Sequence, residues 1–148
     1  MNNLKKQDGA SILEFLIVIP ILLLLAFTAV EFGAVFTRYN TVTKSVQDAA
    51  RYLSTDKSKV NAKKDKAKNL IEYGSLTTET KILPGTFEFP SSFPNITNEN
   101  HVIVSVTYKH EPVMGQTLNN LLGLITGTKG TLDLSIDLTA TSVMRYVK

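Results

Sequence analysis

The strongest pattern in the chain is an apolar run near its N-terminus. Residues 12–36 are apolar except for Glu14, Thr28 and Glu31. A bilayer core of about 30 Å is crossed by roughly 20 helical residues, so the run is long enough to span a membrane. The main alternative is a secretory signal peptide, whose apolar core of about 7–15 residues ends at a small-residue cleavage site. This run is longer and offers only a weak site at residues 26–29, which favours a retained membrane helix.

The charges that flank the run do not fix its orientation. Lys5 and Lys6 precede it beside Asp8, whereas Arg38 and Lys44 follow it. The excess of basic residues expected on the cytoplasmic side is therefore not clear on either side. The short N-terminal tail and the large C-terminal part favour a tail inside and a domain outside.

A helical pattern continues past the apolar run. Apolar residues recur at alternating spacings of four and three, at Val35, Tyr39, Val42, Val46, Ala49 and Leu53. Such a stripe lies on one face of a helix. We therefore expect one helix over residues 10–53, about 66 Å long at 1.5 Å per residue, which projects beyond the membrane.

A second helix is predicted after a break at residues 54–58. Residues 60–73 have helical spacing, and Gly74 follows as a C-cap. The residues expected to face inward are Val60, Ala67, Leu70 and Ile71.

From residue 75 onward the pattern alternates with period two, which indicates strands. Short strands are expected on both sides of a turn at Pro84–Gly85, in residues 80–85 and 86–89. A longer strand is predicted over residues 101–111, and its inward residues are Val102, Val104, Val106 and Tyr108. Residues 114–125 are less regular and fit either a short helix or an apolar loop, followed by a turn at 126–130.

The last strand alternates most regularly, over residues 131–147. The residues expected on its apolar face are Leu132, Leu134, Ile136, Leu138, Ala140 and Met144. Polar residues occupy the positions between them, which is typical of an antiparallel sheet with one face in water. The other face needs a cover, and the helical stripe from Val42 to Leu53 is the natural one.

These patterns predict an α+β fold, in which a long N-terminal transmembrane helix extends into a small extracytoplasmic domain with an antiparallel sheet. The expected parts are a polar leader at 1–9, the transmembrane helix at 10–36, a helical region at 37–74 and the sheet domain at 75–148.

Charge and composition exclude little but point away from nucleic acid. The formal net charge is +3, and the absence of cysteine rules out disulfides and thiolate metal sites. A cluster of lysines comprises Lys57, Lys59, Lys63, Lys64, Lys66 and Lys68. It could bind anionic lipid or nucleic acid. No arginine or aromatic residue is interleaved, so a solvated helix face is the favoured interpretation and no nucleic-acid partner is expected.

The polar residues of the sheet region do not form a catalytic pattern. His101 and His110 lie at opposite ends and on opposite faces of one strand, so they are expected at the surface or rim rather than on a shared metal. Asp133 and Asp137 lie about 13 Å apart along the last strand, too far for a catalytic pair. Residues 123–130 lack the order of glycine, lysine and hydroxyl that a phosphate loop needs. We expect no enzyme, no metal and no cofactor.

Glu14 and Glu31 stand out because a carboxylate in hydrocarbon costs a few kcal/mol unless it is paired or neutral. Glu31 lies about 26 Å further along the helix than Glu14. It is then near the opposite interface, within reach of lipid headgroups or Arg38. Exposure to the headgroups and a role in a specific contact are both open.

Glu14 needs a partner near the start of the helix. Lys5 and Lys6 are one candidate, although Gly9 interrupts the leader between them and the helix. If the chain is cut after Gly9, Ala10 gains an α-ammonium one helical turn from Glu14. This amine could pair with Glu14 of its own helix or of a neighbouring subunit.

A set of spaced residues connects Gly9 with both glutamates. They are Gly9, Glu14, Phe15, Pro20, Glu31, Phe32 and Gly33, followed by residues 49–53. Their spacing resembles the prepilin-like proteins with a class III signal, most closely the TadE-like minor pseudopilins of the tight-adherence (Flp) pilus system. Residues 138–147 also resemble the closing strand of that family.

The resemblance implies that a membrane prepilin peptidase cuts between Gly9 and Ala10 on the cytoplasmic side. It implies a single-pass protein of the bacterial inner membrane, with its N-terminus cytoplasmic and its C-terminal domain extracytoplasmic, that stays there or joins a pilus. The implied partners are the peptidase, other pilins and pseudopilins and the assembly platform, in adhesion and biofilm formation. Glu14 then acts in recruitment through the amine of an adjacent subunit. Ala10, where many type IV pilins have phenylalanine, argues against a major pilin.

Three alternatives predict different behaviour. A signal-anchored envelope binding module that never enters a filament predicts no cleavage and normal pili on deletion. A membrane-tethered enzyme needs a convergent set of polar residues, which residues 75–148 do not offer. A secreted domain predicts a mature start near Val30.

Overall fold

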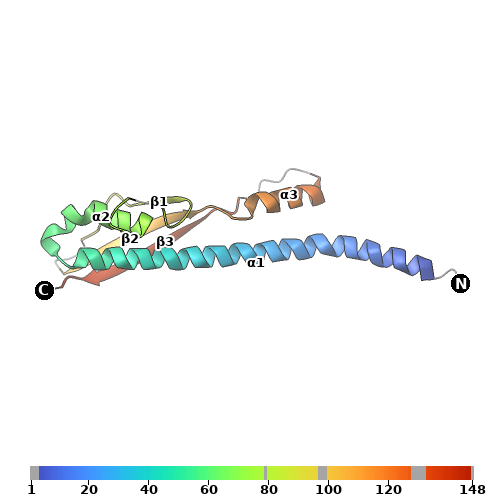
Figure 1. Ribbon diagram of the computed structural model, residues 1–148, viewed down its shortest axis with the longest axis horizontal. Helices are drawn as coiled ribbons and strands as arrows, with labels where there is room; N and C mark the ends of the chain where they lie inside the picture. The colour runs from blue at the N-terminus through green and yellow to red at the C-terminus, as the bar shows by residue number, and fades with distance from the viewer. Residues whose placement is uncertain (1–3, 79, 97–99, 128–132, 148) are drawn as a thin grey trace. The chain divides into compact units, whose positions relative to one another are not determined.

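The fold is described by a computed structural model that covers residues 4–78, 80–96, 100–127 and 133–147, with side chains from Ser11 onward. The elements in chain order are α1 (Leu4–Ser54), η1 (Lys57–Lys59), α2 (Val60–Tyr73), β1 (Thr86–Glu88), β2 (His101–His110), α3 (Gly115–Thr126) and β3 (Ile136–Arg145), as Figure 1 shows. This is the predicted α+β fold.

The chain divides into two compact units. Unit 1 comprises Met1–Ala34 and Pro112–Leu134, and unit 2 comprises Val35–Glu111 and Ser135–Lys148. Helix α1 contributes its first half to unit 1 and its second half to unit 2. The units are described in turn.

Helix α1 starts earlier than the sequence pattern predicted. It begins at Leu4, six residues before Ala10, and runs through Pro20 to Ser54. Leucine, lysine and glutamine form helices well, and a helix extends cooperatively once it is nucleated, so the first residues continue it despite Gly9. Residues 1–3 of the predicted leader lie outside the described residues.

The second half of α1 supplies the main stripe of the core of unit 2. Val42, Val46, Ala49 and Leu53 are fully or almost fully buried, as the heptad-like spacing predicted. Tyr39 was also predicted on this stripe, but it is exposed. Val35, the first residue of the predicted stripe, is half-buried against the core, and the fully buried part begins at Val42, two turns later.

The break and the second helix lie where the sequence predicted them. The Asp56 side chain caps η1 by accepting a hydrogen bond from the Ser58 N–H at 3.0 Å. Helix α2 then ends at Gly74, whose φ of 69° is left-handed and whose N–H donates to the Leu70 carbonyl at 3.1 Å. Val60, Ala67 and Ile71 are buried, while Leu70 is half-buried.

Strands β1, β2 and β3 form one antiparallel sheet in that order. Strands β2 and β3 pair along their whole length, from His101 opposite Arg145 to His110 opposite Ile136. The predicted inward face of β2 is confirmed, since Val102, Val104, Val106 and Tyr108 are buried. On the outer face, hydroxyl groups bond across the strands, Ser105 to Thr141 at 2.9 Å and Thr107 to Thr139 at 3.1 Å.

Two strand predictions need correction. Residues 80–85 form no strand, because the Ile82 N–H donates to the Glu72 carbonyl at the end of α2 and the segment is held there. Strand β3 begins at Ile136 rather than at residue 131, and Ile136 is exposed because it sits at the last position of the ladder. Leu132 lies outside the described residues.

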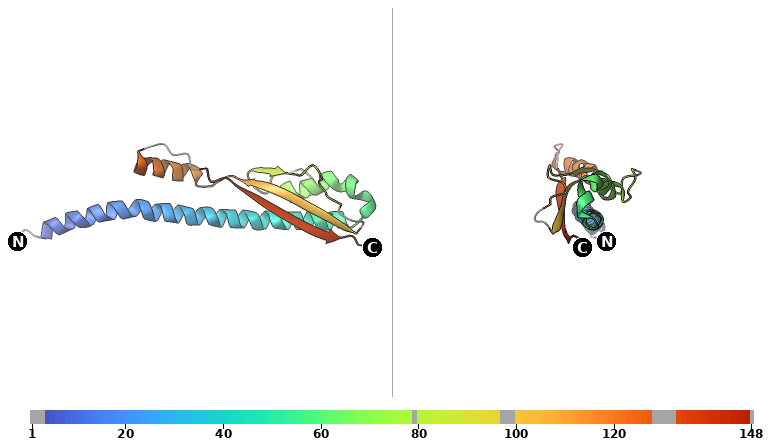
Figure 2. Two further views of the ribbon diagram at one scale, coloured as in Figure 1. Left: turned by 180° about the vertical axis from the view of Figure 1, so that it is seen from behind. Right: turned by 90° about the vertical axis from the view of Figure 1, so that its left-hand side faces the viewer.

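The core of unit 2 joins helices and sheet. Figure 2 shows the second half of α1 together with α2 on one side of the strands. The buried cluster comprises residues of α1, α2 and all three strands, with Phe93 from the loop before β2. Tyr108 packs against Phe87 and its hydroxyl donates to the Pro84 carbonyl in the predicted turn. This packing gives the wet sheet face and the covered sheet face that the alternation predicted.

The end of the chain is tied back to the end of α1. The Tyr146 N–H donates to the Asn100 carbonyl at 3.0 Å, and the Val147 N–H donates to the Ser54 carbonyl at 3.0 Å. The carbonyl of Ser54 belongs to the last residue of α1, a position whose acceptor has no partner within the helix. The C-terminal segment therefore supplies a donor to that helix end.

Of the two possibilities for residues 114–125, the structure shows a helix, α3. Its first internal hydrogen bond runs from the Leu118 N–H to the Met114 carbonyl, and Gly127 caps its end with a φ of 69°. The turn predicted at residues 126–130 lies mostly outside the described residues.

Candidate membrane and assembly helix

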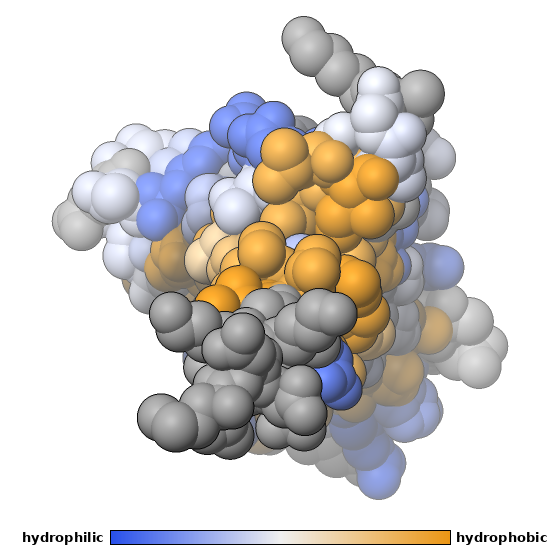
Figure 3. Space-filling model, turned by 90° about the vertical axis from the view of Figure 1, so that its right-hand side faces the viewer, coloured by the Kyte–Doolittle hydropathy of each residue, from blue (hydrophilic) through white to orange (hydrophobic). Residues whose placement is uncertain are grey.

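The first half of α1 exposes a long apolar surface. Its exposed large residues are Ile12, Leu13, Phe15, Leu16, Ile17, Val18, Ile19, Ile21, Leu22, Leu23, Leu24 and Leu25. Figure 3 looks onto the molecule from the N-terminal side of α1 and shows apolar side chains over much of that face. An exposed apolar surface of this extent marks a contact with membrane or with protein. In the described part of the chain, α1 is the one helix long and apolar enough to cross a membrane, which is consistent with single-pass anchoring.

Glu14 lies within this exposed surface. Its side chain is exposed, one turn after Ser11 and flanked by Leu13 and Phe15. Ser11, Glu14, Phe15 and Val18 line a shallow hollow on one face of the helix. The carboxylate is thus presented outward among apolar side chains, available to a group from outside the chain. Gly9 and Ala10 lie within α1. The structure describes only the backbone there, because side chains are described from Ser11 onward.

Glu31 has the opposite environment, because it is only 7% exposed. Its Oε1 accepts a hydrogen bond from the Val113 N–H at 3.1 Å, and its Oε2 accepts one from the Met114 N–H at 2.9 Å. These are the two residues directly before α3, in the same unit as Glu31. We call this arrangement the Glu31 cap.

The Glu31 cap serves a need that α3 cannot meet by itself. The N-cap residue of α3 is Met114, which has no side-chain acceptor for the free N–H groups at a helix start. A carboxylate near this end is also stabilised by the partial positive charge of the helix dipole. Glu31 thus makes a contact within unit 1, while the predicted contact with another helix stays a prediction.

A second polar contact joins α1 to the end of β2, within unit 2. The Arg38 Nη1 lies 2.9 Å from the His110 Nδ1 and donates to the Glu111 carbonyl at 2.5 Å. Since a guanidinium only donates, Nδ1 accepts and the neutral ring carries its proton on Nε2. The prediction that His110 lies at the surface is wrong, because it is 1% exposed.

Sequence reasoning missed both contacts because their partners are far apart in the chain. Glu31 and Met114 are 83 residues apart, and Arg38 and His110 are 72 residues apart. One signal was available, since α3 starts at Met114-Gly115 without a serine, threonine, aspartate or asparagine to cap it. A helix start without its own acceptor indicates that another segment supplies one.

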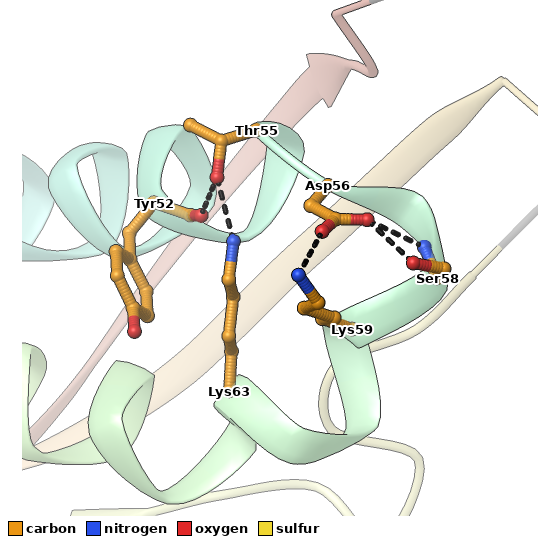
Figure 4. A network of polar contacts seen from close by, with 6 residues as sticks. All are labelled: Tyr52, Thr55, Asp56, Ser58, Lys59 and Lys63. Atoms are coloured by element: carbon orange, nitrogen blue, oxygen red, sulfur yellow. Dashed lines mark hydrogen bonds and ion pairs between the residues drawn. The ribbon is translucent and has the colours of Figure 1, made fainter.

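Several members of the lysine cluster have contacts within the domain. Figure 4 shows Lys63, whose Nζ donates to the Thr55 hydroxyl at 2.7 Å and lies over the Tyr52 ring, and Lys59, whose Nζ is 3.3 Å from the Asp56 carboxylate. Lys68 lies over the ring of Phe89. The predicted solvated helix face therefore also holds α2 to its neighbours.

The remaining polar groups of the sheet do not converge. His101 is exposed, while His110 faces the core from the other side of the strand, so the predicted opposite orientation is confirmed. Asp137 is exposed on β3, and Asp133 is exposed before that strand begins. The described residues hold no group of three or more histidine, aspartate or glutamate side chains placed to bind a metal.

One protein family resembles the N-terminal part of the chain. Residues 9–51 match the model of the TadE-like protein family. The matched segment covers less than a third of the chain and contains Glu14, Pro20, Glu31 and Arg38 of α1. No curated protein and no solved structure matches the chain significantly.

The fold and the family match are compatible. A long helix with an exposed apolar half, joined to a small α+β domain, is consistent with single-pass membrane anchoring. The match over residues 9–51 indicates a likeness to proteins associated with the Tad pilus. That family is a structural, non-catalytic one.

Proposed function

We propose that this protein is a TadE-like minor pseudopilin that is needed to assemble a tight-adherence (Flp) pilus used in adhesion and biofilm formation. It is anchored by α1 in the bacterial inner membrane, with its N-terminus in the cytoplasm and its sheet domain outside. The observation that carries the proposal is the TadE-like match over residues 9–51, which covers the exposed apolar half of α1.

The processing step fits the local chemistry around Gly9. A glycine inside a helix costs about 1 kcal/mol relative to alanine, so Gly9 weakens the first turns of α1. A peptidase that cuts between Gly9 and Ala10 removes Lys5, Lys6 and Asp8, and lowers the formal net charge from +3 to +2. The cut leaves an α-ammonium at Ala10 and an α1 that starts with its apolar half.

The exposed carboxylate of Glu14 then has a chemical partner. An ammonium and a carboxylate that pair in an apolar environment form a charge-assisted hydrogen bond, and each removes the cost of burying the other alone. Because Glu14 points outward, the amine of an adjacent pilin or pseudopilin can reach it. Pairing of this kind sets the stagger between neighbouring helices as subunits leave the membrane for a filament.

Processing is tested by intact-mass analysis of the protein from cells with and without the prepilin peptidase. The expected mature chain starts at Ala10 only in cells that have the enzyme. A protein that keeps residues 1–9 in both strains contradicts the cleavage proposal. A chain that starts near Val30 instead identifies a secreted domain.

The assembly role is tested by Glu14→Gln, which removes the charge and keeps the size of the side chain. We expect normal amounts of protein in the membrane but a loss of most surface pili. Asp48→Asn is a matched control, because Asp48 is also exposed on α1 but lies beyond the apolar half. Full piliation with Glu14→Gln contradicts the pairing role, and full piliation after deletion of the gene supports the alternative of an envelope binding module outside the filament.

A further inference from the structure

Helix α3 carries an apolar surface that the protein does not cover. Leu118 is buried, whereas Leu124 is 82% exposed and Ile125 is 52% exposed. Val113, just before the helix, is half exposed. One side of α3 therefore packs within the protein while another side presents large apolar residues outward.

The sequence around α3 is free of charge over an unusual length. After Glu111, the next charged residue is Lys129, so residues 112–128 carry none. Helices on the surface of a soluble domain normally place charged residues on their outer side. The outer side of α3 carries asparagine, glutamine and threonine near its start and leucine and isoleucine near its end.

The Glu31 cap fixes where α3 begins. Glu31 ends the uncharged stretch of residues 15–30, which is about 24 Å long as a helix. If this stretch crosses the bilayer core, Glu31 lies at the outer edge of the core, and the start of α3 lies there too. Figure 1 shows α3 extending from this region beside the first half of α1, and both belong to unit 1.

We infer that α3 is a second membrane-contacting element, which dips into the outer leaflet beside α1 with Leu124 and Ile125 against lipid. The inference rests on the proposed anchoring of α1 in the membrane. With 12 residues α3 is about 18 Å long, too short to span the core. Its neutral polar first half suits the headgroup layer and its apolar second half suits the layer beneath.

The lack of charged residues in α3 favours lipid as the group that covers its exposed face. The exposed apolar residues of α3 belong to the same unit as those of the first half of α1. Because α3 begins beside Glu31 and is about 18 Å long, it ends no deeper than about the middle of a bilayer core of about 30 Å.

The absence of tryptophan from the chain allows a direct test with single tryptophan probes. Three full-length variants are placed in phospholipid vesicles: Leu124→Trp in α3, Leu22→Trp in the middle of α1, and Val143→Trp on β3. All three positions are exposed in the structure, so the substitutions leave the core intact. Emission is then quenched by lipids brominated at shallow or deep acyl positions and, separately, by iodide in the water.

We expect brominated lipids to quench both the probe at 22 and the probe at 124, because both positions lie about 13–14 Å from the level of Glu31 at 1.5 Å per residue. The probe at 143 should lose emission only to iodide. If the probe at 124 responds to iodide as the probe at 143 does, α3 lies in water and the inference fails while the membrane span stands. If neither quencher affects the probe at 124, another protein copy covers α3, which also overturns the inference. If bromine does not quench the probe at 22, the anchoring of α1 itself is wrong.

Discussion

Along the first half of α1, leucine and isoleucine side chains point outward, whereas the apolar stripe between Val42 and Leu53 is fully buried. The two halves belong to one continuous helix, so secondary structure does not distinguish them. The difference lies in what surrounds each half. In the second half, α2 and the sheet cover one stripe and polar residues occupy the rest. In the first half apolar residues surround the whole helix, and only an apolar medium or other helices can cover them.

This comparison shows that the two halves of α1 should respond differently to the same change. Leu53→Ala removes a fully buried side chain and should lower the free energy of unfolding of the domain by about 2–5 kcal/mol. Leu25→Ala, at a position that is 66% exposed, should change it by less than about 0.5 kcal/mol. Denaturant unfolding in detergent, followed by tyrosine fluorescence, measures both. Equal losses would mean that the first half of α1 is part of the cooperative core.

The Glu31 cap offers a second comparison, between the two glutamates. Glu31→Ala leaves the Val113 and Met114 N–H groups without their acceptor and should destabilise α3 by about 1–3 kcal/mol. Hydrogen exchange should then accelerate at the Leu118 amide and stay unchanged at Val104 in β2. Glu14→Ala should change neither amide. Protection of Leu118 that survives Glu31→Ala would show that the cap does not hold α3.

Two glycines with different backbone conformations offer a third comparison: Gly74, which has a positive φ after α2, and Gly33, which lies inside α1. Gly74→Ala forces a left-handed φ of 69° on alanine and brings its Cβ to 3.0 Å from the Ile82 Cγ2, so it should cost about 1–2 kcal/mol. Gly33→Ala lies inside α1 with no atom within 4 Å of the added Cβ, so it should stabilise the helix by about 0.5–1 kcal/mol. Thermal unfolding of the two variants should shift in opposite directions. Shifts of the same sign would contradict this account of Gly74.

The smallest effect concerns the cap between α1 and α2. The hydrogen bond from the Ser58 hydroxyl, with the nearby Lys59, lowers the pKa of Asp56 below its usual 3.8. A carboxyl whose pKa is lowered by folding adds stability above its unfolded pKa, and this stability is lost as the pH falls through the folded pKa. Unfolding at a series of pH values should therefore show that the advantage of the native protein over Asp56→Asn shrinks as the pH falls below about 4. A constant difference would show that the charge of Asp56 does not contribute.

The parts that the sequence predicts well are those that depend on neighbours in the chain. The spacing of apolar residues identified α2 with its Gly74 cap, the buried face of β2 and the stripe from Val42 to Leu53. The segment at 80–85 was predicted less well, because the hydrogen bond from the Ile82 N–H to the Glu72 carbonyl holds it at the end of α2. The start of β3 was predicted too early, because the ladder with β2 ends at Ile136.

The residues of the candidate site also differ in how well the sequence predicts them. Glu14 stands out in the sequence because residues 15–30 after it carry no charge, and the structure shows its side chain exposed. Glu31 and His110 could not be placed, because the contacts of Glu31 with Met114 and of His110 with Arg38 exist only after distant segments have come together. The Glu31 carboxylate accepts hydrogen bonds from the protein's own backbone, and only the folded structure shows this.

The bond from the Val147 N–H to the Ser54 carbonyl bears on the order in which the protein can fold during synthesis. Residues 42–53 of α1 leave the ribosome well before β3 and the segment at Tyr146 and Val147 that closes over the end of α1. Contacts between segments so far apart in the chain form late, because the entropy of closing a long loop must first be offset. The apolar stripe of α1 therefore remains open to chaperones, or to a wrong partner, until residues 136–147 have been synthesised.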